Sequence, residues 1–281
     1  MGPIPKKSDF PSQVTLDIVP PRPVGSAPVR STNVLILLHG LGDSHVPYIS
    51  FASAMNLPET TCILIRGPVA MPFDLPGYHW GDDLLLDSNT GLPDVDPGFE
   101  KSTKTIAQGV IIDTLVKKLG YRLREILLFG FGQGGSVACS IALEVERRLA
   151  LARKEAHSSS QESSSAHTGA IPTQVESELG GVISVGAVLP LSASQPNSPL
   201  TGKAKTAVLL VGGSGPSSAL ADTSGVKRTE QTFGAVQVVR WNNRKGDGMP
   251  KNREEMLPIM QFFARRLRSR QGVPEGSVEI S

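Results

Sequence analysis

Residues 130–135 have the sequence Gly-Phe-Gly-Gln-Gly-Gly, and they follow directly on an apolar run at residues 126–129. A helical pattern begins immediately afterwards. A tight glycine turn between a strand and a helix can hold its central residue in a strained backbone conformation, from which a nucleophilic serine projects. The flanking Gly130 and Gly134 of that pattern are present, but its central residue is Gly132. We therefore expect the turn to be kept and the nucleophile to be missing.

The same turn also fits a phosphate-binding loop, because Gly130, Gly132 and Gly135 match the spacing G-x-G-x-x-G. A dinucleotide site needs this turn early in the fold, with an acidic residue about 20 positions further on. Glu144 and Glu146 come sooner than that and fall within the predicted helix. A nucleotide-binding role remains an alternative.

A second loop, residues 38–44 (Leu-His-Gly-Leu-Gly-Asp-Ser), follows another apolar run. A His-Gly loop in this place can supply a backbone N–H group to an oxyanion hole. We expect the amides of Leu41 and Gln133 to form a pair of anion-binding donors. We expect His39 and Gly40 to line the same cleft.

The elements that must position these loops follow from the hydrophobic pattern. Short apolar runs predict strands buried on both faces of a parallel sheet. They lie at residues 34–38, 62–65, 126–129, 181–187, 207–211 and 236–240. Helical periodicity occurs at residues 102–118, 136–152 and 253–267. The alternation predicts an α/β fold, with a mostly parallel central sheet and helices on both faces.

We expect one domain, residues 30–268, flanked by a loose N-terminal segment (1–29) and a loose C-terminal tail (269–281). Within the first segment, residues 14–19 could form a short strand. Residues 154–178 are polar and serine-rich, which predicts a disordered insertion after the second helix.

Composition narrows the function classes. The 281 residues are 39% hydrophobic and 19% charged, which is typical of a globular protein, and the net charge of +2 gives no footprint for nucleic acid. Cys62 and Cys139 lie in apolar surroundings without metal-ligand spacing. The N-terminus has no apolar signal sequence, and no stretch approaches the roughly 20 apolar residues of a membrane span. We expect a cytoplasmic protein without stable membrane insertion, metal or cofactor.

The two loops together resemble those of the acyl-protein thioesterase / phospholipase-carboxylesterase family of α/β hydrolases. In that family Leu-His-Gly-Leu-Gly-Asp follows a strand, and Gly-Phe-Ser-Gln-Gly-Gly forms the nucleophile turn. The resemblance covers residues 30–152 and 179–268. It implies the α/β-hydrolase fold, and it implies that Gly67, Pro68 and Trp80 line an acyl-binding groove.

The chain departs from the family at all three positions of the Ser-Asp-His triad. The serine position is Gly132, the acid position falls at about Gly215, and the histidine position is Met249. The chain has five histidines, and none comes after residue 167. A late-loop base is therefore missing whatever the alignment in this region.

Three interpretations stay open. The first is a non-catalytic family member, a pseudoenzyme that binds an acyl or carboxylate ligand or an acylated protein. The second is a carboxylic ester or acyl thioester hydrolase with a non-standard mechanism, in which Asp247 or His39 acts as the base. The third is a nucleotide-binding protein that uses the glycine turn. Loss of the triad favours the first, because removing one member already costs several orders of magnitude in rate.

Overall fold

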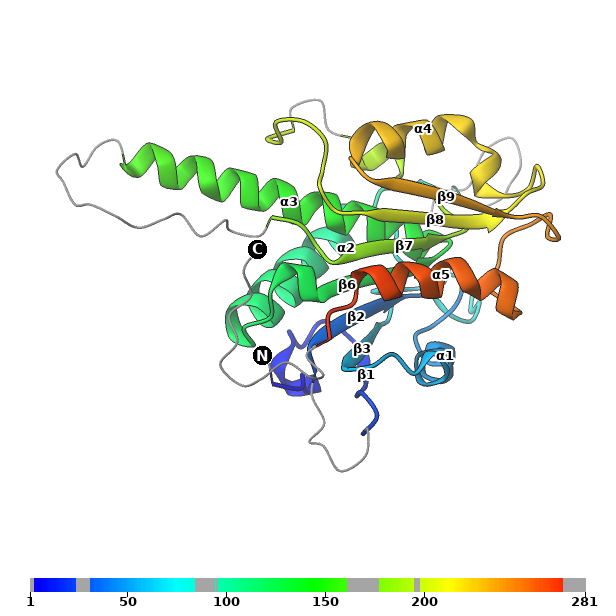
Figure 1. Cartoon of the computed structure of the whole chain (residues 1–281), viewed down its shortest axis with the longest axis horizontal. Helices are drawn as coiled ribbons and strands as arrows, with labels where there is room; N and C mark the ends of the chain where they lie inside the picture. The colour runs from blue at the N-terminus through cyan, green and yellow to red at the C-terminus, as the bar shows by residue number, and fades with distance from the viewer. Residues whose placement is uncertain are drawn as a thin grey trace.

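The computed structural model describes residues 3–23, 31–83, 94, 96–160, 177–194 and 198–269. Its centre is a seven-stranded sheet with the order β1-β3-β2-β6-β7-β8-β9 (Figure 1). The strands are β1 (Leu16–Val19), β2 (Asn33–Leu38), β3 (Thr60–Ile65), β6 (Ile126–Phe131), β7 (Gly181–Val185), β8 (Val208–Gly213) and β9 (Val236–Trp241). Only β1 runs antiparallel to its neighbour; β2, β3, β6, β7, β8 and β9 pair in parallel. The predicted α/β-hydrolase-type sheet is confirmed.

Helices cover both faces of this sheet. One face carries α2 (Glu100–Lys104), which continues as the π-helical η2 (Thr105–Lys118), together with α3 (Gln133–Ser160) and α4 (Thr223–Thr232). The other face carries α1 (Pro47–Met55) and α5 (Arg253–Arg266). A small hairpin, β4 (Val69–Ala70) with β5 (Tyr78–His79), lies outside the main sheet. Single 3₁₀ turns complete the chain: η1 (Lys7–Asp9), η3 (Leu123–Glu125), η4 (Leu191–Ala193) and η5 (Ala219–Ala221).

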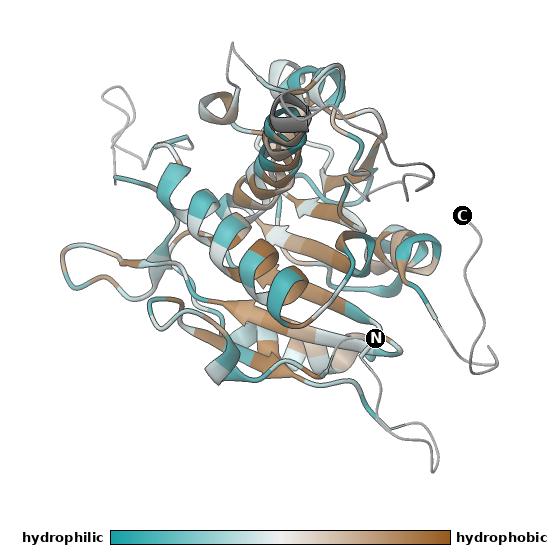
Figure 2. Ribbon diagram, turned by 90° about the vertical axis from the view of Figure 1, so that its left-hand side faces the viewer, coloured by the Kyte–Doolittle hydropathy of each residue, from teal (hydrophilic) through white to brown (hydrophobic). Residues whose placement is uncertain are grey.

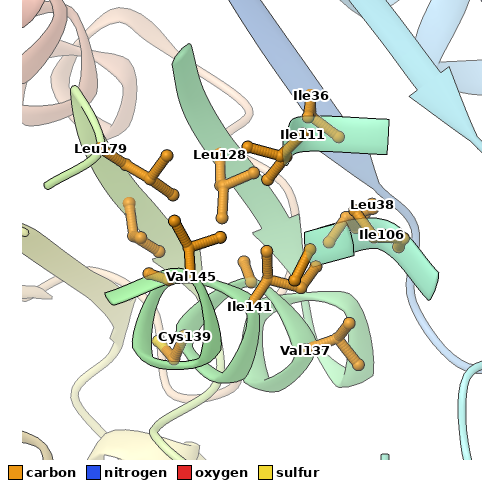
Figure 3. Close-up of a cluster of buried hydrophobic side chains, with 14 of the residues drawn as sticks. Ile36, Leu38, Ile106, Ile111, Leu128, Val137, Cys139, Ile141, Val145 and Leu179 are labelled. Carbon is orange, nitrogen blue, oxygen red and sulfur yellow. The ribbon is translucent and has the colours of Figure 1, made fainter. Parts of the chain in front are cut away.

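The unbroken apolar strands explain the two layers of helices. Successive side chains of a strand point to opposite faces, so Ile36 and Leu38 pack with one set of helices and Leu35 and Leu37 with the other. On the first face, Ile141 and Val145 of α3 lie toward Leu128 of β6, and Ile111 of η2 lies beside Ile36 of β2 (Figure 3). Figure 2 shows the brown strands enclosed by helices whose outer sides are teal. None of the described helices has an apolar stretch long enough to cross a membrane.

The N-terminal segment differs from the expectation that residues 1–29 are loosely held. Residues 16–19 form β1, and the side chains of Phe10 and Leu16 are buried in the core. The strand pairs antiparallel with β3, from Leu16 opposite Ile65 to Val19 opposite Cys62. The pairing supplies the hydrogen bonds that the exposed edge of β3 lacks. The segment therefore belongs to the domain over residues 3–23.

The second helix also differs from its expected end. The serine-rich sequence predicts a disordered insertion at residues 154–178, but α3 continues to Ser160. Residues 151–156 are Leu-Ala-Arg-Lys-Glu-Ala, all good helix formers, so helical propensity extends the helix before the serine-rich run begins. Residues 161–176 of the insertion and 270–281 of the tail lie outside the described residues.

Candidate functional site

Gly132 occupies the turn between β6 and α3 with a left-handed backbone, φ +51°. Its amide donates a 2.9 Å hydrogen bond to the carbonyl of Val185 on the neighbouring strand β7, and its own carbonyl accepts from Gly135 and Ser136. A Cβ atom built on Gly132 would have Gly40 Cα, at 3.9 Å, as its nearest contact. The turn therefore has the backbone of a nucleophile elbow and room for a side chain, but it carries none.

The flanking glycines are required by close backbone packing. A Cβ on Gly130 would lie 2.1 Å from the carbonyl oxygen of Gly134. A Cβ on Gly134 would lie 2.4 Å from the carbonyl oxygen of Leu38. Both distances are far below van der Waals contact. The helix and the two strands can approach this closely only with glycine at these positions, as the sequence pattern indicates.

The two predicted amide donors follow the two glycines that meet here, Leu41 after Gly40 and Gln133 after Gly132. Within the described part of the chain, neither amide donates a hydrogen bond. The loop that carries Leu41 is held by the β4–β5 hairpin, since Gly42 donates to the carbonyl of Tyr78 at 3.0 Å. Two free backbone donors on fixed supports can bind a carbonyl oxygen or an anion.

His39 is buried beside this loop, with both ring nitrogens engaged. The amide of Gly67 donates to Nε2 at 2.8 Å, so Nε2 must be the unprotonated nitrogen. Nδ1 consequently carries the proton and donates it to the carbonyl of Gly40 at 2.7 Å. Burial holds the pKa of His39 below its usual value, which keeps the ring neutral. The side chain fixes two loops and has no free lone pair with which to accept a proton from substrate.

Trp80 links the loop that carries His39 to the start of α3. Its indole Nε1 donates to the carbonyl of His39 at 2.8 Å, and its ring centroid lies 5.1 Å from that of His39. Its backbone amide donates to Oε1 of Gln133 at 2.7 Å. The predicted site residues around Gly40 and Gly132 are therefore brought together by one hydrogen-bonded network.

The late loops place the other two expected triad positions at the same edge of the sheet, but in structural roles. Gly215 donates its amide to the carbonyl of Lys245 at 2.9 Å. A Cβ on Gly215 would lie 2.8 Å from that same oxygen, so the two loops touch through their backbones. The Met249 side chain is partly buried against the core on the α5 face. Neither residue presents a group that could serve as acid or base.

Asp247 connects these loops. Its Oδ1 accepts from the amide of Gly213 and from Ser218 Oγ, both at 2.8 Å, and its Oδ2 accepts from the amide of Ala219 at 2.7 Å. A Cβ on Gly186, after β7, would come within 2.6 Å of Asp247 Cβ. A carboxylate from the loop after β9 thus holds the loop after β8. These bonds use its oxygen lone pairs, which makes Asp247 a poor candidate for the base of a non-standard mechanism.

The sequence pattern predicts the two glycine loops but not the structural role of Asp247. The sequence signal for that role is the glycine at position 186. Its φ of +65° and its close approach to Asp247 leave room only for a hydrogen atom. Among the described residues, no group of three or more His, Cys, Asp or Glu side chains could hold a metal ion.

Comparison with known proteins decides the family. Residues 22–160, about half of the chain, match the phospholipase/carboxylesterase family model. The chain belongs to the phospholipase/carboxylesterase family of α/β hydrolases. An uncharacterized hydrolase of Schizosaccharomyces pombe is 33% identical over 171 residues, 59% of this chain and 58% of the relative. Acyl-protein thioesterase 1 of Mycosarcoma maydis is 31% identical over 122 residues, 39% of this chain and 50% of that protein. The chain thus spans between half and three fifths of these relatives.

Solved structures extend the agreement in fold over most of the chain. Zea mays acyl-protein thioesterase 2 superposes with a TM-score of 0.55 at 15% identity, covering 90% of this chain and 99% of that one. A carboxylesterase from Mesorhizobium loti superposes with a TM-score of 0.54 at 14% identity, covering 84% and 90%. At these identities the likeness shows the α/β-hydrolase fold. The resemblance inferred from the two loops is confirmed.

Proposed function

We propose that this protein is a non-catalytic member of its family, whose cleft at the elbow binds an acyl or carboxylate group without hydrolysing it. The observation that carries the proposal is Gly132, which has the backbone of a nucleophile position, φ +51°, and no side chain. Serine-based acyl transfer needs a nucleophile and a base that takes its proton. The sequence supplies no serine at the elbow and no histidine after residue 167.

Binding is supported by what remains at the cleft. The amides of Leu41 and Gln133 do not depend on the triad, and they remain free to donate to a carboxylate or carbonyl oxygen. The space in front of Gly132 would accommodate the head group of such a ligand. A free fatty acid or the acyl group of a modified protein carries that chemistry.

The hydrolase alternative requires a base, and the two residues proposed for it are engaged elsewhere. His39 uses both ring nitrogens, and Asp247 accepts three hydrogen bonds from the loop after β8. An oxyanion hole alone supports ~10³-fold acceleration over water, which is little for a dedicated enzyme. The nucleotide alternative predicts stabilisation of the fold by ATP or NAD⁺ in thermal unfolding.

The test is turnover of the purified protein on p-nitrophenyl esters and acyl thioesters of varied chain length. A Gly132→Trp variant, which fills the cleft, is the control for contaminating esterases. We expect both proteins to stay at background and carboxylates to raise the Tm of wild type only. Turnover by wild type that disappears in Gly132→Trp would refute the proposal and favour the hydrolase alternative.

A further inference from the structure

The last strand of the sheet, β9, has a neighbour on one side only. It follows β8 in the strand order, and no described strand lies beyond it (Figure 1). The amide of Val208 on β8 donates to the carbonyl of Ala235 at 2.8 Å, which sets the direction of the backbone groups along β9. These groups alternate in direction along a strand, so the N–H and C=O of Val236, Val238 and Arg240 point away from β8. Within the described part of the chain they have no hydrogen-bond partner.

The helices on either side of the sheet are held further in. On one face, Arg228 of α4 donates to the carbonyl of Leu189, after β7, at 2.9 Å, and Thr229 Oγ1 accepts from the amide of the same residue at 3.1 Å. On the other face, a Cβ atom on Gly181, the first residue of β7, would lie 2.7 Å from the Phe262 ring of α5. Both helices are thus anchored at β7, two strands from the open edge. The strand itself is exposed or half-buried up to its last residue.

Two arginines border this edge, one on each face of the sheet. Arg240 is exposed on the face that carries α4, and its Nη2 donates to the carbonyl of Leu220 at 2.9 Å. Arg265 of α5 is exposed on the other face, where its Nη2 donates to Oε1 of Gln237 at 2.8 Å. Neither guanidinium forms an ion pair with a described carboxylate. Residues 236–246 contain no Asp or Glu, so the edge carries positive charge.

The two arginines define a spacing for an added strand. Arg240 and Gln237, where Arg265 is held, are three residues apart, so their side chains point to opposite faces. Residues directly opposite each other on paired strands share a face, so two carboxylates three positions apart on the added strand would meet both guanidinium groups. A second copy of this chain would bring the same two cations and no carboxylate from its own β9. The charges therefore favour an acidic peptide over self-pairing.

We propose that β9 is a docking edge for an extended acidic segment of another protein. The segment adds to the sheet as a further strand, and its backbone pairs with Val236, Val238 and Arg240. Two of its carboxylates, three residues apart, pair with Arg240 and Arg265. We expect antiparallel pairing, because it is slightly more stable per residue than parallel pairing. None of these residues belongs to the elbow cleft, so the proposal does not depend on what the cleft binds.

Fluorescence polarisation with labelled, end-capped synthetic peptides tests the edge. The first probe, Thr-Glu-Val-Thr-Glu-Val-Thr, has its carboxylates three residues apart. The second, Thr-Glu-Thr-Glu-Val-Val-Thr, has the same composition with the carboxylates two apart. We expect the first probe to bind about 2- to 5-fold more tightly than the second, because one cross-strand charge pair is lost in the second. We expect no binding of Thr-Lys-Val-Thr-Lys-Val-Thr.

Variants of the two arginines separate the charges from the backbone. Arg240→Gln and Arg265→Gln should each weaken the first probe by about 2- to 5-fold and remove its advantage over the second. Arg22→Gln is the matched control. Arg22 is an exposed arginine that follows β1 at the opposite edge of the sheet, and it donates to the carbonyl of Ser53, so affinity should not change.

Val238→Pro tests the backbone pairing. The N–H of Val238 points away from β8, so proline there removes a docking donor and keeps the ladder to β8. We expect the folded variant to lose binding of the first probe. If Val238→Pro does not fold, N-methylation of the probe serves instead. A methyl group on its central threonine, whose N–H faces β9 in this register, should abolish binding, whereas one on its first valine, whose N–H faces away, should not.

Several outcomes would overturn the proposal. Absence of binding of the first probe, or equal affinity for the two glutamate probes, would refute the charge pairing. Affinity that is unchanged in folded Val238→Pro, or in both arginine variants, would exclude this edge. A dimer in analytical ultracentrifugation that Val238→Pro dissociates would assign the edge to a second copy of the chain. None of these results bears on whether the elbow cleft binds a carboxylate.

Discussion

The backbone amide of Trp80 donates a 2.7 Å hydrogen bond to Oε1 of Gln133, the first residue of α3. The bond links the residue that follows β5 to the residue whose amide is one of the two expected anion-binding donors. A side-chain acceptor at position 133 is thus needed to satisfy the amide of Trp80, a residue buried at this junction.

Replacing Gln133 tests that link. Gln133→Leu keeps the size of the side chain but leaves the Trp80 amide without its acceptor, which should lower the free energy of unfolding by about 1–3 kcal/mol. Gln133→Glu retains an acceptor and should cost less. Urea denaturation measures both variants, and equal losses would show that the hydrogen bond is not what Gln133 contributes.

Substitutions at Gly132 and Gly134 should have very different costs. Gly132→Ala meets no atom closer than 3.9 Å and suffers only from its left-handed backbone, so it should cost about 1–2 kcal/mol of stability. Gly134→Ala would force its Cβ to within 2.4 Å of the Leu38 carbonyl oxygen and should cost more than about 3 kcal/mol, or prevent folding. Chemical denaturation gives both values; similar losses would contradict the described turn.

Restoring serine at the elbow should not restore activity. In Gly132→Ser the hydroxyl would occupy the position of a nucleophile, but the part of the chain that the structure describes places no base there to take its proton. We expect turnover of p-nitrophenyl butyrate to remain within a few-fold of wild type, and we expect no labelling by fluorophosphonates. Strong labelling of Gly132→Ser would reveal a base that the described residues do not disclose.

Asp247 should matter for stability. Asp247→Asn keeps one acceptor oxygen but turns an amide group toward the N–H of Ala219 or Gly213, which should cost about 1–3 kcal/mol. Asp222→Asn is a matched control: Asp222 accepts from the amides of Ser224 and Gly225 at the start of α4, and asparagine is also a good N-cap. Thermal unfolding compares the two. If both variants lose the same small amount of stability, Asp247 is not the connection between the loops after β8 and β9.

Stability should decrease as the pH falls below about 6.5, the usual pKa of histidine. Burial lowers the pKa of His39 and of His45 in the folded protein, so the unfolded chain takes up these protons first. The contribution of the neutral rings is complete above pH 6.5 and is lost as the pH falls toward their folded pKa values. Urea unfolding at pH 7.5 and 5.5 measures the loss. His39→Gln, which cannot titrate, should reduce the difference; an unchanged difference would assign it to other groups.

The sequence predicts the sheet and the elbow because both depend on local signals. The runs at residues 34–38 and 126–129 are apolar without interruption, and the glycine turn follows its strand directly. The hydrophobic pattern does not predict helix α4, because most of its residues are polar. Its clearest signal is the N-cap Asp222. The bonds of Asp247 join residues between 28 and 34 positions away, so no local pattern reports them.

The antiparallel strand β1 also protects the molecule from its neighbours. It covers the edge of β3, whose six residues are all buried, and would otherwise offer that strand's free backbone groups to another chain. Asp17 on β1 forms an ion pair with Lys7 and accepts a hydrogen bond from His45 Nε2 at 3.1 Å, so the new edge of the sheet carries charge. A shortened protein that begins after β1 would therefore be prone to aggregate through β3, even though both of its glycine loops are retained.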